Sequence, residues 1–386
     1  MSDPTPMIER LAPISVMMTS TSYPQGAEDW KGVFISQLLH ALAGCPQLET
    51  SYWGPSGELP ENASYLCNSE ESAWLTWLME QGGIAHMVRK NGFGCLFSVL
   101  KLLFLLRQAY KRQGMISIYH VNWLQNALPL WGTTQPLLVT VLGSDFGLLK
   151  IPGMTTLLRQ VFKKRRCVIA PNAEWMKHEL EQRFGDIAKI ITIPLGINNE
   201  WYGVERLPSK SSKNKWLVVS RVTHKKIGAL FEWGKPVFCH NDCHELHLFG
   251  PMQEQMIMPE WIHYHGSTHP KALYENWFPQ ATGLITLSQH DEGRPQVMLE
   301  AMAAGLPIIA SNISAHKNFI VHQQTGLLVE SQKDFVQAIE WLAYPANNQI
   351  VAIEASKWVR RNVGTWADCA QRYLKVYHSM LPNGAE

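Results

Sequence analysis

Three features are scarce in this chain, and each scarcity excludes a class of protein. The seven cysteines are scattered and odd in number, which fits free thiols in a reducing compartment better than a disulfide framework. The most apolar run, CLFSVLKLLFLL at 95–106, includes Lys101 and is shorter than the roughly 20 residues that span a bilayer. The N-terminal stretch has acids and prolines where a secretion signal needs a basic start and an apolar core. We therefore expect a cytoplasmic protein, at most peripheral on the inner face of a membrane.

Charged residues are also few, at 17% of a chain that is 46% hydrophobic, which is typical of a folded globular protein. The net charge is only +2, but its distribution is uneven. Residues 1–85 hold two basic and ten acidic side chains, a net of −8. Residues 86–170 hold twelve basic side chains and one acidic one, a net of +11. So basic a block indicates an anionic partner, such as a membrane surface, a nucleic acid or a charged substrate.

Short apolar β-branched runs alternate with amphipathic stretches along the chain. Five such runs precede residue 197 and five follow residue 214, and a polar stretch at 198–215 separates the two series. Strands that alternate with helices predict parallel sheets, and 386 residues exceed the usual size of one core. We predict an α/β protein of two Rossmann-like, doubly wound domains: 1–200, rejoined by a C-terminal helix at 365–386, and 201–364.

One segment, SQHDEGRPQVMLEAMAAGLP at 288–307, combines several signals. It follows a predicted strand, and Pro295 suits the first position of the next helix, which ends at Gly305. Glu292 lies in the loop and Glu300 lies inside the helix. Free N–H groups of a first helical turn favour a phosphate, and carboxylates accept hydrogen bonds from sugar hydroxyls. The segment predicts a site for a nucleotide diphosphate joined to a hydroxyl-rich group, although two acids that merely favour a helix N-terminus give the same pattern.

A second segment, KWLVVSRVTHKKIG at 215–228, places two cations after a predicted strand. Arg221 and Lys226 are five positions apart, and Gly228 follows. Such a pair can neutralise a diphosphate without a metal ion. The chain has no Asp-x-Asp pair, the usual holder of the divalent cation of a nucleotide-sugar. We therefore expect neither a metal nor a cofactor, although an ordinary exposed basic loop also fits the pair.

The order of these segments resembles that of the retaining glycosyltransferases with two Rossmann domains (GT-B fold, family 4, glycosyl transferases group 1). The resemblance extends over nearly the whole chain. SQHDEGRPQVMLEAMAAGLPIIAS is similar to the family's S-x-x-E-G-x-P-x-x-x-x-E-A-M-A-x-G-x-P, and VVSRVTHKKIG to its G-R-x-x-x-x-K-G loop. ITIPLGIN at 191–198 and LGSDF at 142–146 match two further family segments. The resemblance implies domains that face each other across a cleft, with the acceptor on the N-terminal side and the donor on the C-terminal side.

The resemblance also implies roles for individual residues. Glu292 would contact hydroxyls of the donor sugar, and Glu300 would contact the ribose. Arg221 and Lys226 would hold the diphosphate and stabilise it as a leaving group, and His120 would line the acceptor side of the cleft. The other implied site residues are Gly293, Arg294, Pro295, Gln296, Val297, Gly32 and Gly250 for the donor, and Asp145 for the acceptor or its loop.

The implied activity is transfer of a sugar, with retention, from a nucleotide diphosphate donor to a hydroxyl acceptor, in the synthesis of a surface glycan or a lipid-linked saccharide. No residue suited to a covalent double displacement can be named, so we expect front-face attack with electrostatic stabilisation of the leaving group. A UDP-sugar is favoured because UDP is the commonest donor nucleotide in the family. Leu142 stands where the family has a histidine, and Arg294 where it has an aromatic residue, so the donor sugar stays open.

Two other functions compete with transfer. A sugar-nucleotide epimerase of similar architecture would need acid and base groups around the sugar ring, and the pattern of two cations and two glutamates argues against it. A nucleotide-sugar-binding protein without turnover is left open by Leu142.

Residues 239–247, CHNDCHELH, contain four possible zinc ligands. The alternation of the predicted strand places Glu245 and His247 on one face and His244 on the other, so one ion could not easily take all of them. A structural metal is the minor alternative here.

Residues 86–113 combine Leu and Phe on one side of a predicted helix with basic residues toward its end. Together with the basic run 163–166 they make a basic face on the first domain, which could lie on an anionic bilayer. A core helix with a basic polar edge gives the same pattern. Nucleic acid is not expected, because the basic residues are not interleaved with stacking aromatics.

Overall fold

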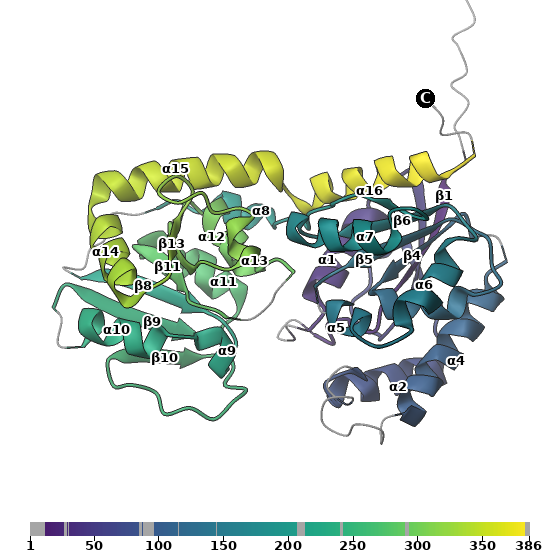
Figure 1. The fold of residues 1–386 in the computed structure, drawn as a ribbon, viewed down its shortest axis with the longest axis horizontal. Helices are drawn as coiled ribbons and strands as arrows, with labels where there is room; N and C mark the ends of the chain where they lie inside the picture. Colours follow the sequence, from purple (N-terminus) through teal and green to yellow (C-terminus); the bar gives the residue numbers. More distant parts are fainter. Residues whose placement is uncertain are drawn as a thin grey trace, which may run out of the picture.

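The structure, a computed structural model, describes residues 12–26, 29, 31–84, 87, 96–114, 116–143, 145–206, 213–239, 242–289 and 293–382. Two α/β domains lie side by side, and the C-terminal helices run along the same side of both (Figure 1). Both domains are built on parallel sheets, so the predicted fold class of two Rossmann-like domains is confirmed.

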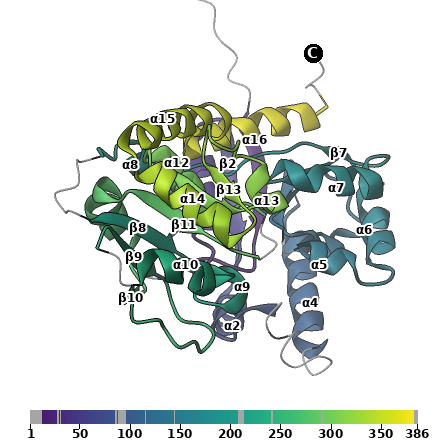
Figure 2. The ribbon, with the colours of Figure 1, turned by 60° about the vertical axis from the view of Figure 1, so that its left-hand side comes forward.

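The N-terminal domain contains a seven-stranded parallel sheet in the order β3-β2-β1-β4-β5-β6-β7. Its strands are β1 (Ile14–Thr19), β2 (Leu48–Trp53), β3 (Ala63–Tyr65), β4 (Ile118–Asn122), β5 (Leu137–Val141), β6 (Cys167–Pro171) and β7 (Lys189–Ile190). Its helices are α1 (Val33–Ala43), α2 (Ser69–Glu80), α4 (Leu96–Arg112), α5 (Asp145–Leu149), α6 (Met154–Phe162) and α7 (Lys177–Phe184), with 3-10 turns η2 (Leu124–Leu130) and η3 (Glu174–Met176). Helices α2 and α4 lie at the outer margin of this domain (Figure 2).

The C-terminal domain contains a six-stranded sheet in the order β10-β9-β8-β11-β12-β13. Its strands are β8 (Asn214–Val219), β9 (His244–Phe249), β10 (Ile262–Gly266), β11 (Gly283–Thr286), β12 (Ile308–Ser311) and β13 (Leu327–Val329). Its helices are α8 (Asn199–Tyr202), α9 (His224–Ile227), α10 (Leu230–Phe238), α11 (Pro270–Ala272), α12 (Gln296–Ala303), α13 (Ser314–Lys317), α14 (Gln332–Ala343) and α15 (Pro345–Asn362), with a π-helical turn η4 (Leu273–Trp277) and a 3-10 turn η5 (Phe278–Gln280).

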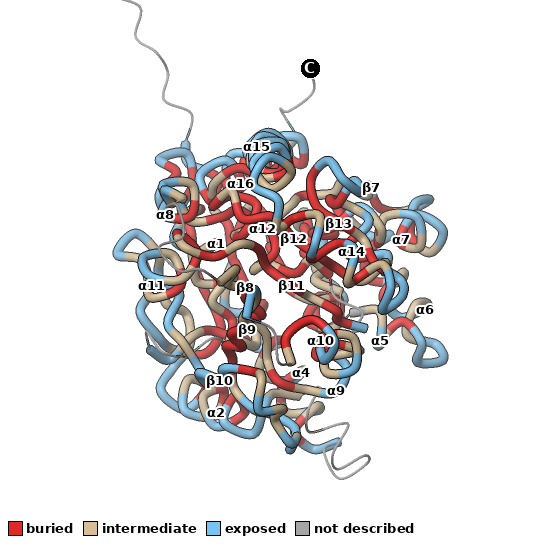
Figure 3. Tube along the Cα trace, turned by 90° about the vertical axis from the view of Figure 1, so that its left-hand side faces the viewer, coloured by how far each residue is buried: buried red, intermediate tan, exposed pale blue. Residues whose placement is uncertain are grey.

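Both sheets are buried on both faces, because helices cover each side. In β1, Met17 packs into the cluster on one face of the sheet, whereas Val16 and Met18 pack into the cluster on the other. In β8, Leu217 and Trp216 alternate in the same way. Figure 3 shows the buried strands surrounded by helices with exposed outer faces. Near-continuous apolar strands of this kind are typical of parallel sheets, whose loops carry the polar chemistry.

The chain crosses between the domains twice, and the two crossings touch. Ile197 donates its N–H to the carbonyl of Gly364 at 3.1 Å and forms a parallel bridge with Thr365. Thr365 and Asp368 form a capping box at the start of α16 (Trp366–Met380), which packs along α1 and into the core of the N-terminal domain. Helix α15 covers the C-terminal domain and α16 the N-terminal one (Figure 1).

Each sheet reverses its strand order once. In the C-terminal sheet, β9 and β10 extend from β8 on one side, and β11 to β13 extend on the other. In the N-terminal sheet the equivalent point lies between β1 and β4. Loops that leave such a switch point diverge, and ligands of open α/β sheets bind there, beyond the carboxyl ends of the strands.

Candidate functional site

Two of the predicted site residues, Arg221 and Gly250, lie at the carboxyl edge of the C-terminal sheet. Arg221 follows β8 and Gly250 follows β9, and Val219 and Phe249, the last residues of these strands, pair directly. A Cβ on Gly250 would lie 1.9 Å from the carbonyl oxygen of Ser220, and its φ is +135°. Only glycine allows the two chain segments to approach this closely. Gly250 therefore lets the loop after β9 pack directly against the backbone that leads to Arg221.

The loop that carries Lys226 is joined to the loop after β11. Thr223 caps the short helix α9, and the N–H of Gln289 donates to the carbonyl of Lys225 at 2.8 Å. Gly228 lies against Leu287, so that a Cβ there would lie 2.0 Å from the Leu287 carbonyl oxygen. These contacts bring the two motifs from the sequence, 221–228 and 288–300, to one place.

Burial and mutual repulsion affect the two cations of this loop. Lys226 is partly buried, and desolvation followed by the nearby Arg221 lowers its pKa to about 7. An ammonium group in such a place gains more from an incoming anion than a solvated lysine does, because the anion offsets both effects. The two positive charges thus converge on one site, as a diphosphate requires.

A histidine that sequence reasoning missed lies beside Lys226. His316, in α13, has no exposed surface, and its Nδ1 lies 2.8 Å from the carbonyl oxygen of Ser311. A carbonyl can only accept, so Nδ1 carries the proton and Nε2 keeps its lone pair. Nε2 is buried without a partner among the described residues, and burial lowers the pKa of His316 to about 4. No motif in the sequence marks this residue.

Glu300 lies one turn into α12, within the described part of the chain. Burial raises the pKa of its carboxyl group to about 7, although the residue as a whole keeps partial solvent exposure. None of the described residues forms a hydrogen bond or ion pair with this carboxylate. The helix ends as predicted, with Gly305 at φ +64° and the N–H of Leu306 donating to the Ala301 carbonyl at 2.8 Å. Pro295 is the residue that precedes the helix, one position earlier than predicted.

The segment 293–296 also contacts the N-terminal domain. The carbonyl of Gly293 accepts a 2.8 Å hydrogen bond from the indole N–H of Trp175. A Cβ at Gly293 would lie 2.4 Å from the Leu142 carbonyl oxygen and 2.8 Å from Oδ1 of Asn172. Gln296 donates to the carbonyl of Gly196 at 2.8 Å. Gly293 is therefore the point at which the two domains meet beside the site.

Arg294 is partly buried. Its guanidinium lies 6.0 Å from the rings of Phe319 and Trp358, and burial, with a smaller effect of Arg372, lowers its pKa to about 10. Its Nε is buried without a partner among the described residues. The residue packs against the apolar core behind α12.

Gly32 occupies the matching place on the N-terminal side, in the loop between β1 and α1. It has φ +71°, and a Cβ would lie 2.7 Å from Oγ of Ser22 and 2.8 Å from the backbone nitrogen of Tyr23. A side chain here would be both strained and blocked. The loop consequently presents bare backbone at the start of α1.

The structure corrects one predicted site residue. His120, in β4, has no exposed surface. Its Nε2 lies 2.8 Å from Oγ1 of Thr140, and its Nδ1 lies 2.6 Å from the hydroxyl oxygen of Tyr377. Burial lowers its pKa to about 3. The prediction that His120 lines the acceptor side is wrong, because the imidazole faces α16 in the core.

Two predicted residues cannot be placed. Glu292 lies outside the described residues, and so does the side chain of Asp145, whose backbone begins α5. Among the described residues, no group of three His, Cys, Asp or Glu side chains could hold a metal ion. In the segment 239–247, His244 accepts from the indole of Trp216, whereas His247 stacks on His263.

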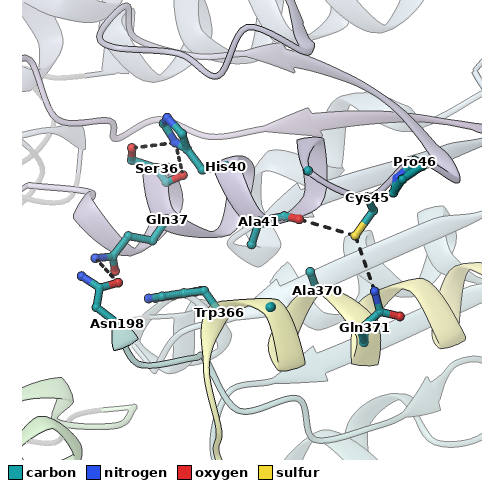
Figure 4. Close-up of a pocket in the computed structure, with 12 residues that line it drawn as sticks. Ser36, Gln37, His40, Ala41, Cys45, Pro46, Asn198, Trp366, Ala370 and Gln371 are labelled. Atoms are coloured by element: carbon teal, nitrogen blue, oxygen red, sulfur yellow. Dashed lines mark hydrogen bonds between the residues drawn. The ribbon is translucent and has the colours of Figure 1, made fainter. Parts of the chain in front are cut away.

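A hollow of about 650 Å³ lies between α1 and α16 (Figure 4). His40, Cys45, Trp366 and Gln371 are among its lining residues. No predicted site residue lines it. Of the helices in the described ranges, none is long and apolar enough to cross a membrane.

In comparisons with known proteins, one family matches the second domain. The profile of the family "Glycosyl transferases group 1" matches residues 214–344. A putative glycosyltransferase of Bacillus subtilis, YtcC, is 31% identical over 137 residues, which cover 34% of this chain and 31% of that protein. A D-inositol 3-phosphate glycosyltransferase of Pseudarthrobacter chlorophenolicus is 29% identical over 107 residues, 27% of this chain and 25% of that protein. The matched segment thus spans less than a third of these relatives.

Solved structures resemble the whole chain. Sucrose-phosphate synthase from Thermosynechococcus elongatus superposes with a TM-score of 0.70 at 16% identity, covering 95% of this chain and 98% of that one. HepE of Anabaena, in complex with UDP and glucose, gives 0.61 at 12% identity and covers 95% and 100%. At these identities the likeness establishes the fold.

Proposed function

We propose that this protein is a glycosyltransferase that moves a sugar from a nucleoside diphosphate donor to a hydroxyl acceptor. The observation that carries the proposal is the meeting of the Arg221–Gly228 loop with Leu287 and Gln289 after β11, at the switch point of a domain that matches the glycosyl transferases group 1 profile. UDP is the favoured donor nucleotide, because HepE, which shares the fold, is described in complex with UDP.

The cations supply the chemistry of the leaving group. Negative charge grows on the diphosphate as the bond to the sugar breaks, and Arg221 and Lys226 lie close enough to each other to share that charge. The partly desolvated ammonium of Lys226 strengthens the interaction. We propose that this pair replaces a divalent cation, and that the departing phosphate receives the acceptor proton on the front face, which gives retention.

The carboxylates and the domain contact position the sugar and the ribose. Glu300, with its carboxylate uncommitted among the described residues, is suited to accept hydrogen bonds from the two ribose hydroxyls. Glu292 is proposed to hold donor-sugar hydroxyls. Closure at Gly293 brings the loop after β11 against Leu142 of the other domain, which excludes water from the reacting bond. An acceptor on a surface glycan or a lipid-linked saccharide is part of the proposal.

A panel of UDP-, GDP- and ADP-sugars tests the function. The true donor should raise the thermal midpoint of the protein in proportion to the logarithm of the donor concentration. It should also be hydrolysed, or its sugar should be transferred to a hydroxyl acceptor with release of the nucleoside diphosphate. Glu292→Ala should abolish transfer while nucleotide binding persists. Binding without turnover in the unmodified protein would instead support the nucleotide-sugar-binding alternative. Turnover that changes the configuration of the sugar without releasing the diphosphate would support the epimerase.

A further inference from the structure

Helix α4 presents an apolar face to solvent. Phe97, Leu100 and Phe104 are 77%, 56% and 60% exposed. Their spacing of three and four residues places them on one stripe of the helix, opposite the buried stripe that includes Leu102 and Leu106. A helix that belongs only to a domain core has one apolar stripe, whereas α4 has two.

The exposed stripe continues onto the neighbouring turn η2. Trp131, just beyond that turn, is 64% exposed, and the guanidinium of Arg107 lies 4.7 Å from its ring. Arg107 also donates to the carbonyls of Pro129 and Trp131, which fixes the turn against the helix. Arg107, one turn after Phe104 in α4, therefore holds the Trp131 ring in place beside the exposed stripe.

The charge around this surface has one sign. Helix α4 contains four cations and no acid. Arg112 is paired with Glu71 at 2.8 Å, whereas Lys101, Arg107 and Lys111 form no ion pair with any described residue. Three of the four positive charges of α4 thus have no acidic partner among the described residues. It belongs to the block 86–170, whose net charge is +11.

We propose that this face, the outward stripe of α4 together with Trp131, docks on an anionic lipid bilayer. Phenylalanine, leucine and tryptophan enter the boundary between head groups and acyl chains, while lysine and arginine reach the lipid phosphates. Helix α4 has 17 residues and carries cations along its length, so in this proposal it lies along the membrane surface and does not cross the bilayer. A second copy of the same face would place cation against cation, and single-stranded nucleic acid would leave the leucine unmatched. The proposal does not depend on the transfer reaction.

Flotation of the full-length protein with vesicles tests the proposal. One vesicle set is phosphatidylcholine alone, and the other contains about a third phosphatidylglycerol. We expect binding at least about tenfold stronger to the anionic set, and its loss at high salt because the Debye length shortens. The triple variant Phe97→Ser, Leu100→Ser, Phe104→Ser should weaken binding to the anionic set by on the order of tenfold or more.

Matched controls decide the outcome. The variant Ile257→Ser, Ile350→Ser, Ile353→Ser removes apolar side chains that are 95%, 57% and 45% exposed on the other domain, and it should bind like the wild type. Both triple variants should keep the wild-type thermal midpoint, since no buried group changes. Unchanged vesicle binding by the α4 variant overturns the proposal. Equal binding to both vesicle sets also overturns it. So does a dimeric wild-type protein that the α4 substitutions, but not the control substitutions, convert to a monomer.

Discussion

At the scale of single residues, burial shifts the pKa values of two predicted site residues in opposite directions. Lys226 and Glu300 both have a pKa of about 7, the lysine lowered and the glutamate raised. Each is poised to change its charge near neutral pH. Because the two shifts are opposite, single substitutions can separate the responses of the two residues to pH.

The first prediction concerns Lys226. Below pH 7 its ammonium is charged and attracts the diphosphate, and above pH 7 it is neutral in the free protein. Donor binding should therefore weaken as pH rises from 7 to 9, by up to about tenfold per pH unit while the bound lysine stays protonated. Isothermal titration with the donor across this range measures the slope.

Lys225 supplies the control for that slope. It is the exposed neighbour of Lys226 and contributes only its backbone carbonyl to the loop contact. Lys225→Ala should keep both affinity and slope, whereas Lys226→Ala should lose both. A wild-type affinity that stays flat between pH 7 and 9 would contradict the role given to Lys226.

The second prediction separates stability from binding at Glu300. Its pKa is raised in the folded protein, so the stability that its neutral form provides is lost as pH rises through about 7. Glu300→Gln should therefore raise the free energy of unfolding at pH 8 by about 1 kcal/mol, a value reduced for the partial exposure of the residue. At about pH 4, below the ordinary glutamate pKa of 4.5, the effect should vanish. Chemical denaturation at both pH values measures this difference.

The same variant should bind the nucleotide more weakly. A glutamine offers one acceptor oxygen where the carboxylate offers two. We expect a loss of about tenfold in affinity for UDP, the proposed donor nucleotide. A variant that is less stable than the wild type at pH 8, or that binds as tightly, would remove the role assigned to Glu300.

At the scale of elements, the loops after β8 and β11 function as one unit because Gly228 allows them to touch. Its φ is +54°, and a Cβ would meet the Leu287 carbonyl oxygen. Gly153, at the start of α6, has φ +80° with nothing within 4 Å of a Cβ. Both glycines have a positive φ, but ψ is −128° at Gly228 and −15° at Gly153, so Gly228 has the more demanding backbone as well as the contact.

This difference gives the third prediction. Gly153→Ala should cost about 1–2 kcal/mol of unfolding free energy from backbone strain alone. Gly228→Ala should cost more, and it should also reduce donor affinity because the loops must separate. Thermal unfolding and donor titration of the pair measure both effects. Equal losses in the two variants would show that the loop contact adds nothing.

At the scale of the whole molecule, the two domains are joined by the paired crossings at 197 and 365 and by the contact at Gly293. Gly293 is buried, and the distances from a Cβ there to Leu142 and Asn172 are shorter than ordinary contacts. The arrangement of the domains beside the site thus depends on the absence of one methyl group.

The fourth prediction follows from that dependence. Gly293→Ala should hold the domains apart, so that the radius of gyration from small-angle scattering increases and turnover falls, on the order of 100-fold. The thermal midpoint should stay near that of the wild type. Trp175→Phe removes the indole donor of the cross-domain hydrogen bond and reduces the ring that packs on Phe146, and its turnover and radius of gyration should lie between those of the wild type and of Gly293→Ala. Unchanged scattering together with unchanged turnover would contradict the prediction.

The sequence alone determined the class of fold and the position of the main loops. Apolar β-branched runs such as those of β1, β5 and β8 are buried on both faces, so their composition reveals them. Strand β2 was missed because Glu49, Thr50 and Ser51 interrupt its apolar pattern, and β3 and β13 because they have three residues each. The Gly305 stop and the loop cations are local signals, so sequence sufficed for them.

Only the tertiary structure decided which polar residues face the site. His120 ends in the core because α16, distant in sequence, supplies Tyr377 as its partner. His316 joins the cations because α13 returns beside α9, and Gly293 meets Leu142 because two separate domains approach there. Local patterns record strand periodicity and caps, which depend on near neighbours in the chain. Burial of a single polar side chain depends on segments hundreds of residues away, and no short pattern records those.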